Sequence, residues 1–450
     1  MSLYSEKISQ WVLVYCGLSI YSLSPLVRFY IPTTVSSVVE LVGFLVLIYA
    51  YLKGNFRGVK GDDSTLLKVF LSWTIFMLLR GDIIGNFLPG VNGFGGAIAT
   101  FIFNGSAGLA YFIPFIILMP IRLDSFYSFR RIGLVLCCIS LVLVGINWEE
   151  IVLSSAIGMT DLEMASGSEA SIRDASRAFL FIPFLVVFLA FCHNYYKGLI
   201  KVVFPIYLLV YFYVQSLGGG RGGTLLALLY IVCFIFIFYK YPLTSTAGRK
   251  TNKWSVRIMA LAALAGFVYV IVYMIQNNAF DYLIHRFDEG ASNGSYLVAY
   301  NREVLRRDLI ADFNDNPISW IIGRGVNGAF ATKMHATNGM RDGIEYGYLH
   351  FVLKGGIPYL LMYVYLLLHC AYLGLFKSKN LLCKSMAFYC IVNFIALYTA
   401  TGPEVSHRYF LVWVSICLLE RKNVRMLSDA EIYNFMNEKY GNTNNVVLKI

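Results

Sequence analysis

The chain has 450 residues, of which 58% are hydrophobic and only 14% are charged, and its formal net charge is +11. Soluble domains carry about 25% charged residues, so this composition excludes an ordinary soluble protein. The positive charge does not indicate nucleic-acid binding, because the lysines lie in short connections beside apolar stretches. These apolar stretches come in blocks of about 20 residues, the length that crosses a bilayer as a helix.

The apolar blocks predict an all-α integral membrane protein with about 12 transmembrane helices, because a backbone in lipid must satisfy its hydrogen bonds internally. The first block has no small-residue cleavage site, so we expect it to be a retained span and not a signal peptide. The chain over residues 1–450 then forms a single membrane domain. The expected spans are residues 9–29, 33–52, 66–83, 96–120, 131–148, 178–194, 199–217, 223–242, 257–276, 347–375, 385–401 and 406–420.

Basic residues in the short loops predict the orientation. Residues 240–257 hold five basic residues and no acidic residue, and residues 377–384 hold three basic residues and no acidic residue. With this set of spans, all the basic short loops lie on one side, which the positive-inside rule makes cytoplasmic. Both termini are then cytoplasmic, including a polar tail at 421–450. The two long loops, at 149–177 and 277–345, lie outside the cytoplasm.

The cysteines and the metal-ligand types form no recognisable site. All nine cysteines lie in apolar spans or in one short basic loop, so we expect no disulfide framework. No Cys/His spacing typical of zinc occurs, and the outer loops contain no Asp-x-Asp motif. The sequence therefore predicts neither a bound metal nor another cofactor.

The stretch GGGRGGTLLALL, residues 218–229, places Arg221 among five glycines at the expected outer end of the seventh span. An unpaired arginine near the bilayer costs a few kcal/mol on insertion scales. One interpretation is that its guanidinium binds an anion at headgroup level, while the glycines leave room and expose backbone amides. The alternative is that Arg221 reaches a lipid phosphate and that the glycines pack helices closely.

The outer loop at 277–345 is long enough to be functional. It holds six arginines and one lysine, whereas the cytoplasmic loops favour lysine. Arginine can bind phosphate or carboxylate through two parallel hydrogen bonds. The alternative is a solvated surface, in which the nine acidic residues of the loop pair with these side chains.

Within this loop, residues 295–313 predict an amphipathic helix with an apolar stripe at helical spacing. Arg302 and Arg306 share a second face of this helix, and Glu303 can pair with Arg307. Arg302 is a candidate ligand-binding residue, although its charge could equally be solvated. The members of the apolar stripe are Leu297, Tyr300, Val304, Leu305 and Leu309.

The next stretch contains the formal pattern G-x-G-x-x-G at Gly323, Gly325 and Gly328. A nucleotide-binding fingerprint would require a surrounding βαβ unit, which this sequence does not provide. The glycines instead predict a tight turn from which Arg324 projects beside exposed backbone amides.

The stretch EYGYLHFVLKGGIPYLL enters the tenth span, with Glu345 at the edge of the membrane and Tyr348 about one turn further along the helix. A carboxylate at this position can serve as a general base, with its pKa tuned by partial burial and by nearby arginines. The alternative is a charge that is favourable at a helix N-terminus. His350 lies deeper, where a lone histidine is more often a satisfied buried residue than a catalyst.

The order of these motifs resembles the superfamily of O-antigen polymerases (Wzy-type) and O-antigen ligases. GGGRGGTLLALL is similar to the small-residue–Arg–Gly–Gly element of that family, and DFNDNPISWIIGRGVNG is similar to its nP…lGxG stretch. The ligases carry His-Asn, nine residues, and then Gly-x-x-Gly or Gly-x-x-Tyr. Here Glu345 replaces that histidine and Gly356 begins the second element, so the chain looks more like the polymerases.

The resemblance implies a metal-independent glycosyltransferase of the membrane-embedded C type in the bacterial inner membrane. Its donor and acceptor would be glycans on undecaprenyl diphosphate, and a chain-length regulator is a further candidate partner. Glu345 would deprotonate the acceptor hydroxyl at the periplasmic face. The candidate residues for binding the substrate and its diphosphate are Arg221, Arg324, Arg341, Arg302, His350 and Tyr348.

Two other functions are open at this stage. One is an O-antigen ligase that moves finished glycan to another carrier, against which Glu345 counts because it replaces the ligase histidine. The other is a transporter or flippase for lipid-linked oligosaccharides. Flippases often have two similar halves and charges within several spans, whereas here the charge concentrates in one outer loop.

Overall fold

The computed structural model describes residues 9–27, 33–54, 56, 61–80, 108–120, 123, 125–146, 207, 210–212, 214, 226–232, 297–332, 339–344, 346–398 and 402–432. This part of the chain is mostly helical, as expected. Its elements are α1 (Gln10–Val27), α2 (Thr33–Leu52), α3 (Ser64–Leu78), the 3-10 helix η2 (Gly108–Leu118), α5 (Ser125–Ile146), α13 (Leu297–Asp315), α14 (Ile318–Ile322), β1 (Phe330–Ala331), β2 (Met340–Arg341), α15 (Gly347–Phe376), α16 (Leu381–Ala396), α17 (His407–Leu419) and α18 (Lys422–Met426).

Helices lie at the expected spans that fall within the described ranges, with two differences. The segment expected at 96–120 is a 3-10 helix where it is described, and it contains Pro114, which removes a backbone donor. Helix α5 begins at Ser125, before the expected start at 131, because the charged residues near its start continue the helix instead of preceding it. The expected loop at 149–177 and the spans at 178–194 and 257–276 lie outside the described residues.

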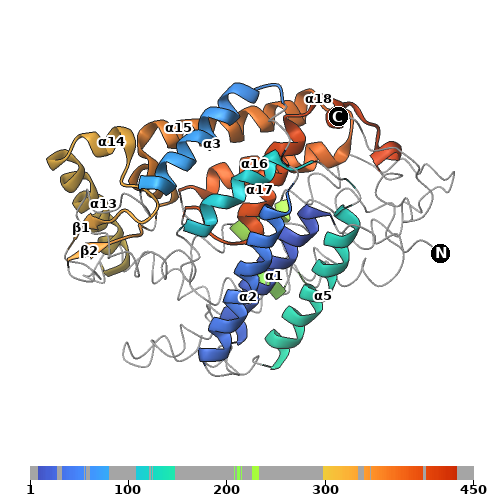
Figure 1. The fold of residues 1–450 in the computed structure, drawn as a ribbon, viewed down its shortest axis with the longest axis horizontal. Helices are drawn as coiled ribbons and strands as arrows, with labels where there is room; N and C mark the ends of the chain where they lie inside the picture. The colour runs from blue at the N-terminus through green and yellow to red at the C-terminus, as the bar shows by residue number, and fades with distance from the viewer. Residues whose placement is uncertain are drawn as a thin grey trace, which may run out of the picture.

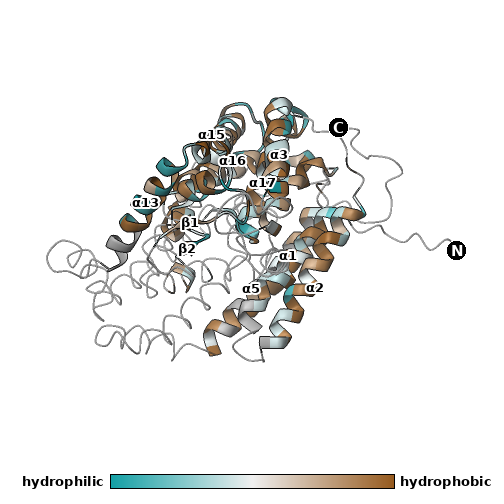
Figure 2. Cartoon of the chain, turned by 60° about the vertical axis from the view of Figure 1, so that its left-hand side comes forward, coloured by the Kyte–Doolittle hydropathy of each residue, from teal (hydrophilic) through white to brown (hydrophobic). Residues whose placement is uncertain are grey.

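Two helices are long and apolar enough to cross a membrane by length and composition, over Thr34–Leu52 and Gly347–Phe376. Figure 2 shows the apolar character of α1, α2 and α15 beside the more polar α13. One face of α2 exposes large apolar side chains, which suits contact with lipid. These side chains are Val35, Val38, Val42, Leu45 and Leu52.

Helices α1 and α2 form an antiparallel pair that depends on glycine. A Cβ atom on Gly43 would lie 2.6 Å from the backbone nitrogen of Tyr21, and one on Gly17 would lie 3.0 Å from the Gly43 carbonyl oxygen. Ser24 also donates a hydrogen bond to Glu40 at 2.8 Å across the pair. This close approach of two backbones is typical of small-residue packing between membrane helices.

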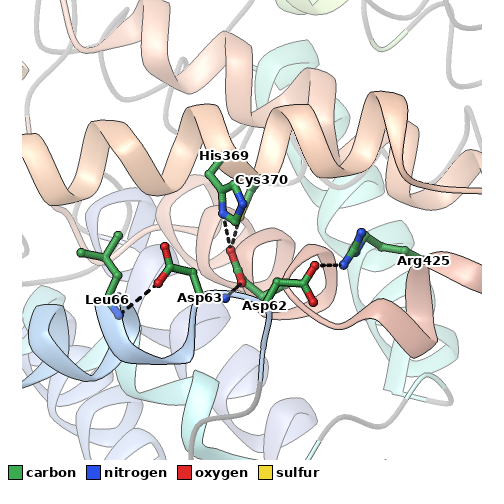
Figure 3. Close-up of polar contacts among 7 residues, drawn as sticks. Asp62, Asp63, Leu66, His369, Cys370 and Arg425 are labelled. Atoms are coloured by element: carbon green, nitrogen blue, oxygen red, sulfur yellow. Dashed lines mark hydrogen bonds and ion pairs between the residues drawn. The ribbon is translucent and has the colours of Figure 1, made fainter.

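A polar network fixes one end of the C-terminal helices (Figure 3). Glu420, fully buried at the end of α17, accepts a hydrogen bond from the Asp63 backbone N–H at 2.8 Å. Its other carboxylate oxygen lies 3.0 Å from Nδ1 of His369 on α15. Arg425 forms an ion pair with Asp62. The start of α3 therefore lies beside the far ends of α15 and α17.

The opposite end of α3 reaches the first part of α15. The indole N–H of Trp73 donates to the Gly355 carbonyl at 2.9 Å, and Arg80 donates to the Gly323 carbonyl at 2.6 Å. Asn380, at the start of α16, donates to the Val424 carbonyl just after α17. Helices α3 and α16 therefore run in one direction and α15 and α17 in the other. Figure 1 shows α13, α14 and the two strands at one end of this bundle and α18 at the other.

Candidate functional site

The polar segment before α15 folds onto the first half of that helix and forms a second hydrophobic core. The amphipathic helix expected at 295–313 is α13, and Leu305 and Leu309 of its predicted stripe are buried. The side chains of Leu297 and Tyr300 lie outside the described residues. The members of this core are Leu305, Leu309, Phe313, Phe330, Ile344, Leu349, Val352 and Leu353.

Helix α15 is broken at Gly356, whose backbone has φ 79° and ψ 176°. Two residues later, Pro358 lacks the N–H that would bond to the Lys354 carbonyl in a regular helix. The sequence-based expectation of a continuous span at 347–375 is therefore incomplete, although the pattern KGGIP contains the signals of a break.

The glycine-rich turn after α14 supplies the hydrogen bonds that this break removes. The backbone N–H of Arg324 donates to the Leu353 carbonyl at 2.8 Å, and that of Gly325 donates to the Lys354 carbonyl at 2.9 Å. Trp73 bonds to the next carbonyl along the helix, that of Gly355. The break in α15 and the G-x-G turn therefore satisfy each other's backbone groups, as a buried helix interruption requires.

We call this contact between the glycine-rich turn and the break in α15 the interlock. Two glycines make it sterically possible. A Cβ atom on Gly356 would lie 2.1 Å from the Ile321 carbonyl oxygen, and one on Gly323, which has φ +63°, would lie 2.4 Å from the Lys354 carbonyl. The tight turn predicted from the sequence is confirmed. The amides beside Arg324 are not exposed, contrary to the prediction, because the carbonyls of α15 accept their hydrogen bonds.

Arg324 is an anchor of this turn. Its side chain is buried, forms an ion pair with Asp312 on α13, and donates to the Ala329 carbonyl at 2.7 Å. Its guanidinium also lies 5.0 Å from the centre of the Phe313 ring. These contacts favour a role in holding the glycine-rich turn to α13 over direct diphosphate binding. The sequence could not reveal this role, because it depends on how α13 packs against the turn.

Lys354 is a buried cation that the sequence analysis did not single out. It is 2% exposed, and its Nζ donates to the Gly328 carbonyl at 2.9 Å. This bond ties the side chain at the break to the far end of the glycine-rich turn.

The other two predicted arginines of the 277–345 loop lie on β2 and on α13. Arg341 is half-buried on β2, opposite Phe330 of β1. Arg302 lies on α13, and its side chain is outside the described residues.

The expected pairing of Glu303 with Arg307 is wrong. The Glu303 carboxylate instead forms an ion pair with Arg306, three residues later, with 2.5 Å between the guanidinium nitrogen and the carboxylate oxygen. This hydrogen bond lowers the pKa of the exposed Glu303 carboxyl.

Glu345 and Arg221 lie outside the described residues, but the residues on either side of Glu345 are placed. Ile344 is buried in the second hydrophobic core. The Tyr346 ring lies 5.6 Å from the Tyr348 ring and 5.9 Å from the exposed Tyr398 ring. The Tyr348 N–H donates to the Leu397 carbonyl. The start of α15 thus lies beside the end of α16, where Tyr346, Tyr348 and Tyr398 form a group of three tyrosines.

A small cavity opens among α15, α16 and α17 near this point. Arg408 lines it and forms an ion pair with Glu404 at 2.9 Å, four residues earlier. Arg408 was not predicted from the sequence, although a basic residue four positions after an acidic one, at the start of an apolar stretch, is a recognisable signal. The lining residues are Phe351, Tyr363, Asn393, Ala396, Leu397, Gly402, Arg408 and Tyr409.

His350 lies against one wall of this cavity. It is 3% exposed, and a Cβ atom on Gly402 would lie 2.4 Å from its Cδ2. Its Nε2 is buried and has no hydrogen-bond partner among the described residues. The prediction that His350 is buried is therefore confirmed.

Within the described ranges, no group of three or more His, Cys, Asp or Glu side chains could hold a metal ion. No protein-family model matches the chain, and no match is found among curated proteins or solved structures.

Proposed function

We propose that this chain is a multi-pass glycosyltransferase of the bacterial inner membrane. It polymerises undecaprenyl-diphosphate-linked repeat units into O-antigen or a similar surface polysaccharide at the periplasmic face. The proposal includes the arrangement of twelve membrane spans with both termini in the cytoplasm. The apolar helices α2 and α15 and the alternating directions of α3, α15, α16 and α17 support it.

The main support for the proposal is a contact between two segments, each of which contains a motif that resembles the family. The segment 312–328 and the frame that runs from Glu345 to Gly356 are separate in the sequence, yet they are joined by backbone hydrogen bonds at the break in α15. The outer segment thereby holds the half-helix that follows Glu345. A catalytic group must be held in a fixed geometry, and a short helix bonded on several sides meets that requirement.

In the proposed reaction, a hydroxyl of the acceptor sugar attacks the anomeric carbon of the donor glycan. Glu345 takes the hydroxyl proton as the new carbon–oxygen bond forms. The bond from the anomeric carbon to the diphosphate breaks, and the electron pair leaves with the diphosphate. Arg221, with Arg341 and Arg302, stabilises the charge that grows on this leaving group.

A flippase is the second candidate, because interrupted helices are typical of transporter substrate sites. In those proteins, unwound backbone carbonyls are left to coordinate an ion. Here the three carbonyls at the break, those of Leu353, Lys354 and Gly355, already accept protein hydrogen bonds. The break therefore favours a fixed scaffold over a transport site.

The test is the glycan that accumulates when the gene is deleted and then restored. Loss of a polymerase leaves single repeat units on the final carrier, and restoring the wild-type chain returns a ladder of long chains. Loss of a ligase instead leaves long chains on undecaprenyl diphosphate. Loss of a flippase stops glycan at the outer face altogether. Either of these two outcomes would refute the polymerase proposal.

A further inference from the structure

The cavity beside Arg408 has no role in the reaction described above, and it contains hydrogen-bonding groups with spare capacity. A guanidinium carries five N–H donors, and Glu404 is the partner that the described residues provide for the Arg408 side chain. Asn393, which also lines the cavity, donates from its side-chain amide to the Tyr389 carbonyl at 2.9 Å, and the same side chain carries a carbonyl oxygen that can accept a hydrogen bond. A donor and an acceptor therefore border the same small space.

The size of the cavity limits what can enter it. The enclosed space suits a group about as large as one water molecule. A hydroxyl or hydroxymethyl group fits this space. The rings of Phe351, Tyr363 and Tyr409 provide apolar walls for the carbon that bears the hydroxyl.

The charge of the groups beside the cavity also favours a ligand that bears a hydroxyl. Arg408 would attract an anion if it were alone, but the Glu404 carboxylate at 2.9 Å neutralises it. Ser406 donates to the same carboxylate oxygen at 3.1 Å, so Glu404 is held in place by the start of α17. An ion pair of zero net charge favours a neutral, hydroxyl-bearing ligand over a phosphate.

The position of the cavity relates it to the proposed reaction. Leu397 lines the cavity, and its carbonyl accepts the N–H of Tyr348, which lies three residues after Glu345. The His350 ring lies against Gly402, another lining residue, because a Cβ atom on Gly402 would lie 2.4 Å from Cδ2 of that ring. The cavity thus lies next to the helix turn that follows the proposed base.

We propose that this cavity is a subsite for a neighbouring hydroxyl or hydroxymethyl group of the acceptor sugar. Arg408 donates a hydrogen bond to the oxygen of that group, and the side-chain carbonyl oxygen of Asn393 accepts a hydrogen bond from its O–H. The inference rests on the proposed function, because it assigns the cavity to the acceptor of that reaction. It makes Arg408 and Asn393 specificity residues for the sugar and leaves the diphosphate to the arginines of the outer loops.

The first experiment measures kcat and KM with the purified full-length chain in nanodiscs. The substrate is the lipid-linked repeat unit extracted from cells that lack this protein. Arg408→Gln should raise KM by about tenfold to a hundredfold, because a charged donor is lost, and Asn393→Leu by about fivefold. Asn423→Leu, at an exposed asparagine on α18, is the matched control and should leave KM unchanged. Unchanged KM in both cavity variants, with melting temperatures equal to that of the wild type, would overturn the proposal.

The second experiment measures binding without turnover. One probe is the oligosaccharide released from the same lipid by mild acid, and the other is inorganic pyrophosphate. The oligosaccharide should bind the wild-type chain and bind Asn393→Leu more weakly. Glu404→Gln keeps an oxygen for Arg408 and Ser406, so it should not change the affinity for pyrophosphate.

Tighter pyrophosphate binding by Glu404→Gln, abolished by adding Arg408→Gln, would identify an anion site and refute the hydroxyl subsite. If the oligosaccharide binds as expected but the wild-type chain makes no polymer, the subsite stands and the polymerase proposal fails. If polymer forms but the cavity variants bind the oligosaccharide like the wild type, the polymerase stands and the subsite fails.

Discussion

Replacing Gly356 by alanine tests the interlock between α15 and the glycine-rich turn. Gly356 has φ 79° and ψ 176°, a region that only glycine adopts readily, so a side chain there costs about 1–3 kcal/mol in backbone strain. The added Cβ would also lie 2.1 Å from the Ile321 carbonyl oxygen, which forces the turn away from the helix. Losing the bonds to the Leu353 and Lys354 carbonyls adds about 0.5–1.5 kcal/mol each, and the expected total loss is about 2–6 kcal/mol.

Two other glycines separate strain from steric conflict. Gly339 has φ +75° and nothing within 4 Å of a Cβ atom, so Gly339→Ala should cost the strain alone, about 1–3 kcal/mol. Gly343 also has open space and has no positive φ, so Gly343→Ala should change the free energy of unfolding by no more than about 0.5 kcal/mol.

The assay is reversible unfolding of the purified chain in mixed micelles with increasing denaturing detergent, followed by tryptophan fluorescence. The expected order of stability is wild type and Gly343→Ala, then Gly339→Ala, then Gly356→Ala. If Gly356→Ala is as stable as Gly339→Ala, the close approach to Ile321 contributes nothing, and the argument for a rigid support beneath Glu345 is wrong.

Three further predictions concern other parts of the chain. Trp73→Phe should keep an aromatic side chain, though a smaller one, and leave the Gly355 carbonyl without its donor, which lowers the free energy of unfolding by about 1–3 kcal/mol in the same assay; an unchanged value would mean that the bond does not support the break. Arg221→Lys should make almost as little long-chain polymer as Arg221→Ala, because a lysine ammonium cannot form the two parallel hydrogen bonds that a guanidinium forms with diphosphate. Normal long chains at normal expression would show that Arg221 does not bind diphosphate in this way. A cysteine at Ser292, in a background without native cysteines, should react with a membrane-impermeant thiol reagent in intact spheroplasts, whereas labelling only after lysis would overturn the proposed topology.

Local patterns predicted the helices well, because hydrophobicity and helical spacing are properties of neighbouring residues. The positions of α1, α2, α13 and α15 follow from runs of apolar residues and from one amphipathic stripe. The positive φ of Gly323 was also predictable, since glycine is the residue that adopts it without strain.

Partner choice was not predictable, because it depends on tertiary approach. Nothing in the sequence near Arg324 indicates that Asp312 neutralises it, or that its own amide bonds to a carbonyl of α15. The cavity at Arg408 is assembled from three helices, so no single stretch of sequence describes it. The break at Gly356 was predictable in part. Its glycine and proline are visible in the local sequence, whereas the groups that hydrogen-bond to the freed carbonyls come from distant segments.

The central claim is that the carboxylate of Glu345 is the catalytic base. A positioned base contributes about 10²–10⁴-fold to a rate. Glu345→Gln keeps the size of the side chain but cannot take a proton, and Glu345→Asp keeps the carboxylate one methylene shorter. If Glu345 instead only stabilises the N-terminus of α15, its replacement should cost about 0.3–1 kcal/mol of stability and leave turnover per folded molecule unchanged.

The measurement is polymerisation of lipid-linked repeat units by purified Glu345→Gln at a folded concentration matched to the wild type. We expect turnover at least about a hundredfold slower than wild type, with substrate binding retained and with part of the activity preserved in Glu345→Asp. Turnover by Glu345→Gln close to that of the wild type would contradict the mechanism and remove Glu345 from it.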